Sequence, residues 1–495
     1  MHFARQLTIE RLATWILFIL LFTMAVQVPL DSDVWWHLRA GEHFLDEGEI
    51  LREDLYSITR QGEDWTNHSW GAQIIIALAY RVTGGDGDVG DSGVIGLALY
   101  SAILGAAGMV LVYRMCAGNI YSRAFVLIIG AAAAAVFWSA RPQMVSFFLS
   151  TVVLYLLYLF KRHDRDYLWT LPPLMILWVN LHAGFAIGFI LLLGFIAGEA
   201  VGNIFDPKSN HAVSWHRLGR VMLITMISVA ALSLNPYGPR MMLYPFETAG
   251  LQSLNLFIQE WRSPDFKNPQ TWPFILLIFG LIAARSKKPI TWSDLSLTLG
   301  TLLLALWASR NISLFAAVAT PTLSRQVDAY LTERGWQVRP MKTVRGARLV
   351  INWILLVVIL LGGLAKIATD LNAQNVEEVQ AEFFPMVALA YLEENPPAGN
   401  MFNFYNWGGL QIYLVRDVPV FVDGRTDLYG DDLLGDYFDS LLGASDWRDL
   451  FDAYDIEAAF LPDESALTTL LREDSGWELV YEDEQAAIFQ KIAEQ

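Results

Sequence analysis

The sequence has little cysteine and little charge. Cys116 is the single cysteine among 495 residues, so a disulfide bond or a cysteine metal cluster within one chain is excluded. Charged residues make up only 17% of the chain and hydrophobic residues 54%, a balance that excludes an ordinary soluble enzyme. The 8 histidines form no H-x-H or H-E-x-x-H pattern, which argues against a histidine metal cage. No small-residue cleavage site follows the first apolar run, so we expect it to be retained as a membrane span.

Apolar runs predict that the chain is a polytopic α-helical membrane protein. Several approach the ~20 residues that a helix needs to cross a bilayer. Others, such as 311–324, are shorter, so we expect about 11 transmembrane helices. The runs cover residues 13–30, 93–113, 121–138, 143–160, 167–181, 184–203, 219–234, 271–284, 292–307, 311–324 and 349–367.

Basic residues predict the orientation of these spans, because cytoplasmic loops of membrane proteins are enriched in lysine and arginine. One alternating arrangement places the basic clusters and the N-terminus on the cytoplasmic side. It places two polar segments, residues 31–92 and 235–270, and the C-terminal part on the extracytoplasmic face. We therefore expect a protein of the cell membrane that works on its outer face. The cytoplasmic residues include Arg5, Arg11, Arg114, Arg123, Lys161, Arg162, Arg217, Arg220 and the segment 325–348.

Acidic residues are concentrated at the C-terminal end. From Asp370 onward there are 27 acidic and 5 basic residues, a net charge of −22, whereas the rest of the chain carries +5. This charge argues against nucleic acid or anionic lipid as a partner. Short strands, including 401–405, 419–423 and 458–462, alternate with helices, which favours a small α/β domain with a mostly parallel sheet. We therefore divide the chain into a transmembrane domain, 1–367, and a soluble domain, 368–495.

The first polar segment predicts helices that lie on the membrane surface. Trp35, Trp36, Leu38 and Phe44 alternate with charged residues, an amphipathic pattern with aromatic side chains typical of the interface. Residues 69–82 form a second apolar stretch, which is too short for a comfortable span. The second polar segment combines prolines and aromatic residues, so we expect it to be a structured loop.

Two aspartates, Asp31 and Asp33, follow the first span directly. In an extended segment, side chains at i and i+2 point the same way, so both carboxylates could face one ligand. Such a pair suits Mg²⁺ or Mn²⁺, or a general base beside a metal. The alternative interpretation is a helix start in which Asp31 or Ser32 is the N-cap.

Histidines and arginines on the expected outer side are candidate substrate ligands. Histidine carries protons near neutral pH, and guanidinium binds phosphate through a planar fork. The alternatives are structural hydrogen bonding for the histidines, which we favour for His43, and snorkelling with a salt bridge for the arginines. The candidates are His37 and His182, with His68 nearby, and Arg141, Arg240, Arg262 and Arg310.

Turns in the C-terminal part provide further candidates. Asp423-Gly424-Arg425 and Gly408-Gly409 lie at predicted strand ends. Because ligands dock at strand ends in α/β domains, Arg425 is a candidate substrate ligand.

These motifs resemble those of the GT-C glycosyltransferases, membrane enzymes that use polyprenyl-phosphate or polyprenyl-pyrophosphate sugar donors, and above all the oligosaccharyltransferase catalytic subunit. That subunit has a D-x-aromatic-aromatic-polar-x-R-A-x-E pattern after its first span, and DVWWHLRAGE fits it from Asp33 through Trp36, Arg39 and Glu42. Phe257-Ile258-Gln259-Glu260 matches the last three positions of its T-I-x-E motif. Tyr405-Asn406-Trp407-Gly408-Gly409 resembles its W-W-D-Y-G motif, without the acid.

The resemblance implies an inverting transfer of a sugar from a polyprenyl-phosphate donor to an acceptor on the outer face. Asp33 would be the essential base or metal ligand, assisted by Asp31 and Glu260. Arg310, with Arg141 or Arg240, would hold the departing phosphate. The implied substrate-binding set is Arg310, Arg141, Arg240, His37, Trp36, Arg39, His182, Trp407 and Arg425, with Mg²⁺ or Mn²⁺ as the implied cofactor. The implied acceptor is a lipid, a glycan or a protein, and membrane lipids would be further partners.

Two other functions fit the same features. A transporter or flippase of lipid-linked sugars is the first, although the spans contain few ionisable residues, of which Glu199 is one. A non-catalytic envelope assembly factor that binds through its acidic C-terminal part is the second.

Overall fold

The computed structural model describes residues 7–87, 92–207, 212–284, 286–336, 344–444 and 446–492. Arg5 and part of the basic segment 325–348 lie outside these residues. Each of the predicted apolar runs forms a helix. These helices are α1 (Ile9–Ala25), α4 (Gly93–Met115), α5 (Ile120–Ala135), α6 (Gln143–Arg162), α7 (Leu171–Leu181), α8 (Phe185–Phe205), α9 (Trp215–Ala231), α12 (Trp272–Ala283), α13 (Trp292–Trp307), α14 (Ile312–Glu333) and α15 (Ala347–Asp370).

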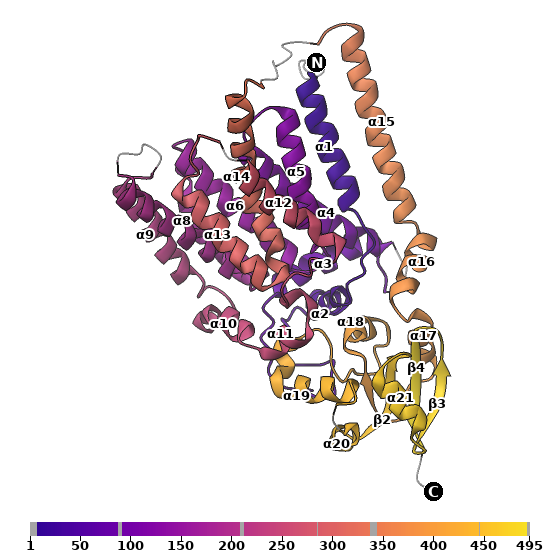
Figure 1. Cartoon of the computed structure of the whole chain (residues 1–495). Helices are drawn as coiled ribbons and strands as arrows, with labels where there is room; N and C mark the ends of the chain where they lie inside the picture. Colours follow the sequence, from indigo (N-terminus) through magenta and orange to yellow (C-terminus); the bar gives the residue numbers. More distant parts are fainter. Residues whose placement is uncertain are drawn as a thin grey trace.

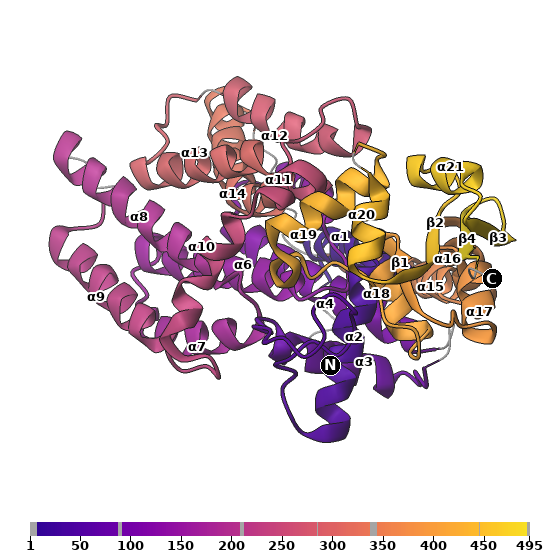
Figure 2. The same cartoon turned by 90° about the horizontal axis from the view of Figure 1, so that it is seen from below.

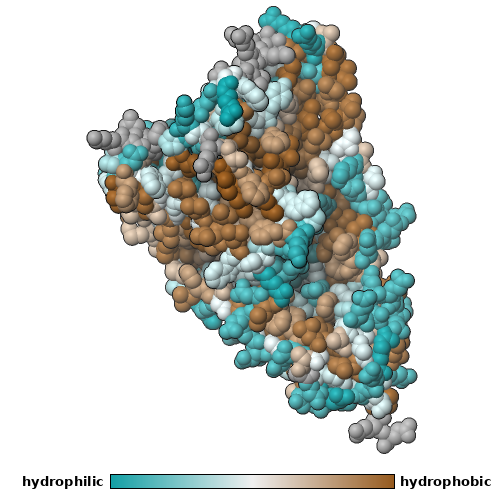
Figure 3. Space-filling view, viewed as in Figure 1, coloured by the Kyte–Doolittle hydropathy of each residue, from teal (hydrophilic) through white to brown (hydrophobic). Residues whose placement is uncertain are grey.

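These helices pack side by side into a bundle whose exposed surface is largely apolar (Figure 1, Figure 3). Within the described residues, α4, α6, α8 and α15 have at least 18 residues and enough hydropathy to cross a membrane. Most of α15 is exposed, and it lies against α1 along the outside of the bundle (Figure 1). An exposed apolar surface of this extent is expected where lipid is the solvent. The predicted class, a helical membrane protein with a C-terminal α/β domain, is confirmed.

The first polar segment forms α2 (Asp33–Glu47) and α3 (Trp70–Val82), which lie at the end of the bundle next to the C-terminal part (Figure 1). Trp35, Trp36 and Leu38 are buried in protein, so the prediction that these side chains lie in the membrane interface was wrong. The indole of Trp35 packs on Tyr413 of the C-terminal part, with ring centroids 5.2 Å apart. A soluble domain therefore covers the apolar face that the sequence pattern assigned to lipid.

The second polar segment is built from short helices, as expected for a structured loop. They are η3 (Gly238–Met242), α10 (Tyr244–Ala249), α11 (Gln252–Phe257), η4 (Gln259–Trp261) and η5 (Pro269–Thr271). The carboxylate of Asp431 in the C-terminal part accepts the backbone N–H groups of Gln252 and Ser253, 3.0 and 2.8 Å away, at the start of α11. The segment is thereby attached to the C-terminal domain. Helices α18 (Tyr405–Leu414) and α19 (Thr426–Leu441) of that domain lie over this segment and over α2 when the molecule is seen from below (Figure 2).

The described residues of the C-terminal part form one four-stranded sheet in the order β1-β2-β4-β3. Only β1 and β2 are parallel, so the prediction of a mostly parallel sheet was wrong. A three-residue connection, 483–485, joins β3 to β4, and a connection this short forces an antiparallel hairpin. The elements are α16 (Ala373–Phe383), α17 (Met386–Glu394), β1 (Asn400–Asn403), α18 (Tyr405–Leu414), α19 (Thr426–Leu441), α20 (Trp447–Ala453), β2 (Ile456–Pro462), α21 (Ala466–Glu473), β3 (Trp477–Glu482) and β4 (Ala486–Lys491).

The predicted strand at 419–423 is absent from this sheet. Val420 instead forms an isolated bridge with Ser57 of the first polar segment, and its N–H donates to the carbonyl of Tyr56 over 2.9 Å. The amide of Asn403 in β1 accepts the N–H of Phe421 at 2.6 Å. The β-forming residues of this segment therefore join the C-terminal domain to the first polar segment.

Candidate active site

A cavity of about 320 Å³ lies between the end of the bundle, the two polar segments and the start of α19. Side chains from each of these parts line it. They include Asp33, Trp36 and His37 of α2, His68, Arg141, Ser146, His182, Tyr244, Glu260, Trp261, Arg310, Thr426 and Asp427. Acidic, basic and imidazole groups from sequence-distant segments are thus brought to one place.

Asp33 is placed by local hydrogen bonds at the start of α2. The carboxylate of Asp31 accepts the N–H of Asp33 at 3.1 Å, and the indole N–H of Trp36 donates to Oδ1 of Asp33 over 3.1 Å. The two aspartates therefore belong to a helix start rather than to an extended segment. Gly424 of the C-terminal domain lies against the Asp33 carboxylate, where an added Cβ would be 1.8 Å from Oδ1. Only glycine permits this approach of the C-terminal backbone.

Arg141 connects three carboxylates across the site. It lies in the turn between α5 and α6, and its side chain is 12% exposed. Its Nε is 3.0 Å from Asp31, its Nη1 is 2.7 Å from Asp33, and its Nη2 is 2.7 Å from Glu260. The guanidinium therefore joins the first polar segment, the bundle and the second polar segment.

Arg310 faces the same cavity with fewer partners. Among the described residues its ion pair is with Glu260, at 3.4 Å, and its guanidinium lies over the Trp261 ring, 4.4 Å from the centroid. The neighbouring Ser309 fixes the backbone, because its N–H donates to the Arg262 carbonyl and its hydroxyl to that of Glu260. Guanidinium N–H groups of Arg310 are thus left to bind an anionic ligand.

The acids of the site differ in how readily they take up a proton. Burial raises the pKa of Asp33 to about 6, against the opposing effect of Arg141. Burial also acts on Glu260, but Arg141 and Arg310 outweigh it and lower the pKa of that carboxyl to about 2. At neutral pH both are ionised, and Asp33 is the acid that gains a proton under mild acidification.

Three neutral histidines form another wall of the cavity. Burial lowers the pKa of His37, His68 and His182, and for His68 the nearby Asp427 opposes this effect. The rings of His68 and His182 lie 5.8 Å apart. This wall therefore offers hydrogen-bonding nitrogens without positive charge.

The donor types of the acidic cluster suit a hard divalent cation, since Mg²⁺ and Mn²⁺ prefer carboxylate oxygens. The carboxylates of Asp31, Asp33 and Glu260, however, all contact the guanidinium of Arg141. In the part of the chain that the structure describes, no group of three or more His, Cys, Asp or Glu residues is placed to hold a metal ion. The arrangement around Arg141 therefore does not fit a metal ion, and Mg²⁺ or Mn²⁺ at Asp31 and Asp33 stays a prediction.

Four of the predicted substrate-binding residues do not line the cavity. Arg240 is exposed on η3, and Arg39 lies 3.8 Å from Glu42 in an ion pair within α2. Trp407 is buried between Phe404 and Phe460 inside the C-terminal domain. The fourth is Arg425, and it forms a structural centre of its own.

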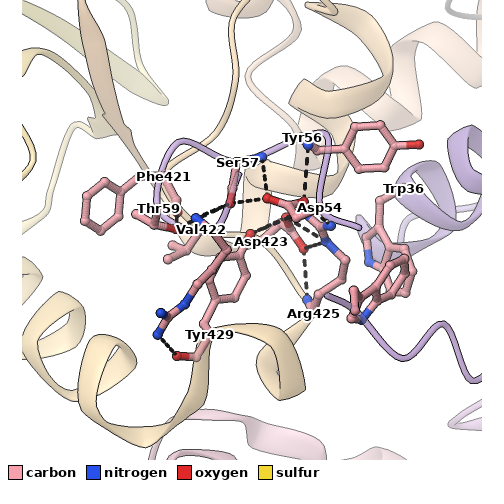
Figure 4. Close-up of polar contacts among 12 residues, drawn as sticks. Trp36, Asp54, Tyr56, Ser57, Thr59, Phe421, Val422, Asp423, Arg425 and Tyr429 are labelled. Atoms are coloured by element: carbon pink, nitrogen blue, oxygen red, sulfur yellow. Dashed lines mark hydrogen bonds and ion pairs between the residues drawn. The ribbon is translucent and has the colours of Figure 1, made fainter. Parts of the chain in front are cut away.

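Arg425 is fully buried where the first polar segment meets the C-terminal domain (Figure 4). Its Nη1 is 2.5 Å from Asp54 and its Nη2 is 2.6 Å from Asp423. The rings of Tyr56 and Trp65 lie 5.2 Å from the guanidinium carbon. No ligand reaches Arg425 in this arrangement, so it stabilises the contact between the two parts.

Sequence reasoning missed several cavity residues. Thr426 and Asp427 follow Arg425 directly, so the turn that was singled out leads into the cavity one residue later. Tyr244 belongs to the second polar segment, in which Arg240, Glu260 and Arg262 were the residues singled out, and His68 was noted without a role. The hydroxyl of Tyr244 is 2.6 Å from Nδ1 of His68 and 2.8 Å from the Asp427 carboxylate. No local pattern predicts this contact of three distant segments.

Solved structures with the same architecture identify the fold as GT-C-like. No protein-family model and no curated protein matches the sequence. The oligosaccharyltransferase AglB from Archaeoglobus fulgidus, in complex with an inhibitory peptide and a dolichol-phosphate, superposes with a TM-score of 0.59 at 10% identity, over 91% of this chain and 69% of that chain. ArnT from Cupriavidus metallidurans, bound to undecaprenyl phosphate, gives 0.51 at 11% identity, over 96% and 97%.

A third structure has the same fold. The arabinofuranosyltransferase AftD from Mycobacteria gives a TM-score of 0.52 at 14% identity, over 99% of this chain and 40% of that chain. Identities this low establish a common fold and no more. The chain therefore has the GT-C-like fold that its motifs suggested, and its function has to be argued from the site.

Proposed function

We propose that this protein is a membrane glycosyltransferase that transfers a sugar from a polyprenyl-phosphate donor to an acceptor on the extracytoplasmic face, with inversion at the anomeric carbon. Three neighbours in fold are named as transferases or were solved with polyprenyl-type phosphates. Fold alone does not decide function. The observation that carries the proposal is the pairing, in one cavity, of an ionisable acid, Asp33, with an arginine available for an anion, Arg310.

Arg310 would bind the phosphate of the donor. It borders the cavity, and its one ion pair with the described residues is at 3.4 Å, whereas the nitrogens of Arg141 are already engaged by three carboxylates. Positive charge placed where a leaving group gains negative charge lowers the barrier to its departure. Arg141 would instead hold Asp33 and Glu260 in place.

Asp33 would act as the general base. The acceptor nucleophile attacks the anomeric carbon, its proton passes to the Asp33 carboxylate, and the bond between that carbon and the phosphate oxygen breaks. The electron pair of that bond leaves with the lipid phosphate, next to Arg310. A pKa of about 6 suits a base that must be ionised at neutral pH and still accept a proton.

Native mass spectrometry of the detergent-purified protein tests this proposal. Wild type should retain a polyprenyl-phosphate sugar, whose mass names the sugar class, and Arg310→Ala should lose it. Arg240→Ala is the matched control, since Arg240 is exposed and outside the cavity. Bulk phospholipid alone in all three proteins would overturn the proposal in favour of a transporter or an assembly factor.

A further inference from the structure

The hydrogen-bond partners of the three cavity histidines determine where each ring carries its proton. His37 comes from α2, His68 precedes α3, and His182 follows α7. Burial lowers the pKa of all three, so each ring is neutral at neutral pH. A neutral imidazole has one N–H donor and one acceptor nitrogen, and the partner of one nitrogen fixes the role of the other.

His182 carries its proton on Nε2. Its Nδ1 accepts the backbone N–H of Gly184 at 3.1 Å, and a backbone N–H can only donate. The hydroxyl of Ser146 is 2.7 Å from the same Nδ1 and itself accepts the indole N–H of Trp178 at 2.7 Å. The serine proton therefore points at His182 as well. With Nδ1 an acceptor, Nε2 is the donor.

His37 has the same protonation pattern. The N–H of Ser69 donates to Oδ1 of Asn67, which turns the amide nitrogen of Asn67 toward Oε1 of Gln73, 2.7 Å away. The amide nitrogen of Gln73 then faces Nδ1 of His37 at 3.2 Å. An amide nitrogen only donates, so Nδ1 accepts and Nε2 of His37 carries the proton.

His68 has the opposite protonation pattern. The single hydroxyl proton of Tyr244 goes to the Asp427 carboxylate, 2.8 Å away, because a carboxylate only accepts. The Tyr244 oxygen, 2.6 Å from Nδ1 of His68, therefore accepts a hydrogen bond from that nitrogen, which carries the ring proton. The lone pair of His68 is consequently on Nε2.

We propose that His37, His68 and His182 form a subsite for a neutral hydroxyl group of a sugar, the transferred sugar or the acceptor. A hydroxyl has one proton to donate and two lone pairs to accept with. The three rings offer one acceptor nitrogen, on His68, and two N–H donors, on His37 and His182. An ammonium group would face two donors, and a carboxylate would face the lone pair of His68. The ligand class rests on the proposed function, which makes the substrate a sugar.

Saturation-transfer NMR with small glycosides tests the subsite in the full-length protein in lipid nanodiscs. The probes are methyl glucopyranoside, its amino-sugar counterpart methyl glucosaminide, and methyl glucuronide, which carries a carboxylate. We expect the neutral probe to bind and the charged probes to bind about tenfold more weakly, the usual cost of one mismatched buried polar group. Because Arg310 in the same cavity could hold the carboxylate of the glucuronide, the comparison is repeated in Arg310→Ala. Equal binding of a charged probe and the neutral probe in that variant would overturn the proposal.

Variants locate the binding. His68→Phe and His182→Phe should each weaken binding of the neutral probe about tenfold, because each removes one hydrogen-bonding nitrogen. His43→Phe is the matched control, since His43 lies on α2 and outside the cavity. Unchanged binding in both cavity variants would overturn the proposal. Should these variants not fold, nitrogen-15 spectra of histidine-labelled wild type decide, because a proton on Nε2 of His68 contradicts the assignment.

Two further arms separate this inference from the proposed function. If His182→Phe retains less polyprenyl-phosphate sugar than wild type but still binds polyprenyl phosphate itself, the hydroxyl belongs to the donor sugar. If His182→Phe retains as much polyprenyl-phosphate sugar as wild type but binds the glycoside more weakly, the hydroxyl belongs to the acceptor. A wild-type protein that retains only bulk phospholipid but still binds the neutral glycoside would remove the transferase proposal and leave the hydroxyl subsite standing.

Discussion

Arg141 and Arg425 are both buried and paired with carboxylates, but their surroundings differ. Arg425 and its partners Asp54 and Asp423 have fully buried side chains, with aromatic rings packed on the guanidinium. Arg141 is bordered by a cavity, and its partners Asp33 and Glu260 keep 25% and 21% of their side chains exposed. A closed charge cluster can only hold two parts of a protein together, whereas an open one can also exchange a proton with a ligand.

The largest expected effect on the rate concerns Asp33, the acid of the open cluster that takes part in the reaction. Asp33→Asn should slow sugar transfer about 10²- to 10⁴-fold, the usual contribution of a general base. Folding should be retained, because Arg141 keeps Asp31 and Glu260 as partners. The measurement is the release of polyprenyl phosphate from the bound glycolipid, followed by mass spectrometry.

Asp31→Asn is the matched control for this substitution. Asp31 contacts the same guanidinium but does not line the cavity, so its loss should have a much smaller effect on the rate. Equal losses in the two variants would mean that Asp33 acts only by holding Arg141.

Substitutions in the closed cluster around Arg425 should lower the stability of the protein rather than its rate of sugar transfer. Arg425→Met leaves Asp54 and Asp423 buried without a counter-charge, and breaking a buried pair in this way costs about 3–5 kcal/mol. We expect a lower thermal unfolding temperature and a poor yield of folded protein. Arg240→Met, at an exposed position, should leave the unfolding temperature unchanged. A stable but inactive Arg425 variant would contradict the structural role.

The rate and the stability should both depend on pH through Asp33 of the open cluster. With a pKa of about 6, Asp33 loses its role as base below pH 6, and the rate should fall about tenfold per pH unit there. The effect on stability has the opposite sign. Because the folded-state pKa lies above the ordinary 3.8, the folded state binds the proton more tightly, and ionising Asp33 lowers the stability as the pH rises from 3.8 to 6.

Measurements of rate and unfolding temperature between pH 4 and 8 test both signs in the same samples. Asp33→Asn removes the titrating group, so this part of the stability profile should become flat. A wild-type rate that stays constant down to pH 4 would show that the rate does not depend on ionised Asp33.

The helices could be predicted well because hydropathy and the distribution of basic residues are properties of the local sequence. It also singled out Asp33, Glu260, Arg141 and Arg310, which the structure brings into one cavity, because each directly precedes or follows an apolar run or matches a motif. Arg425 was assigned to a substrate because a turn at a strand end resembles a binding loop. Its partner Asp54 lies 371 residues away in the chain, and no pattern predicts such a contact.

The C-terminal sheet illustrates the same limit. The β-forming residues at 419–423 are local, but whether they join a sheet depends on Ser57 and Tyr56 in a distant segment. The hydrogen bonds among His68, Tyr244 and Asp427 likewise need three segments to be placed before any of their protons can be assigned. Residue types are therefore predictable at this site, and their pairings are not.

The smallest expected effect concerns the cation of the open cluster. Arg141 supplies positive charge to Asp31, Asp33 and Glu260, so Arg141→Ala would leave three carboxylates without it. We expect weak Mn²⁺ binding to appear in this variant, with a Kd of about 10⁻⁴–10⁻³ M, detectable by electron paramagnetic resonance. Arg141→Ala combined with Glu260→Gln is the control and should lose it. Mn²⁺ bound by wild type at these carboxylates would instead show that the ion displaces the guanidinium, and that the open cluster exchanges its cation as well as its proton.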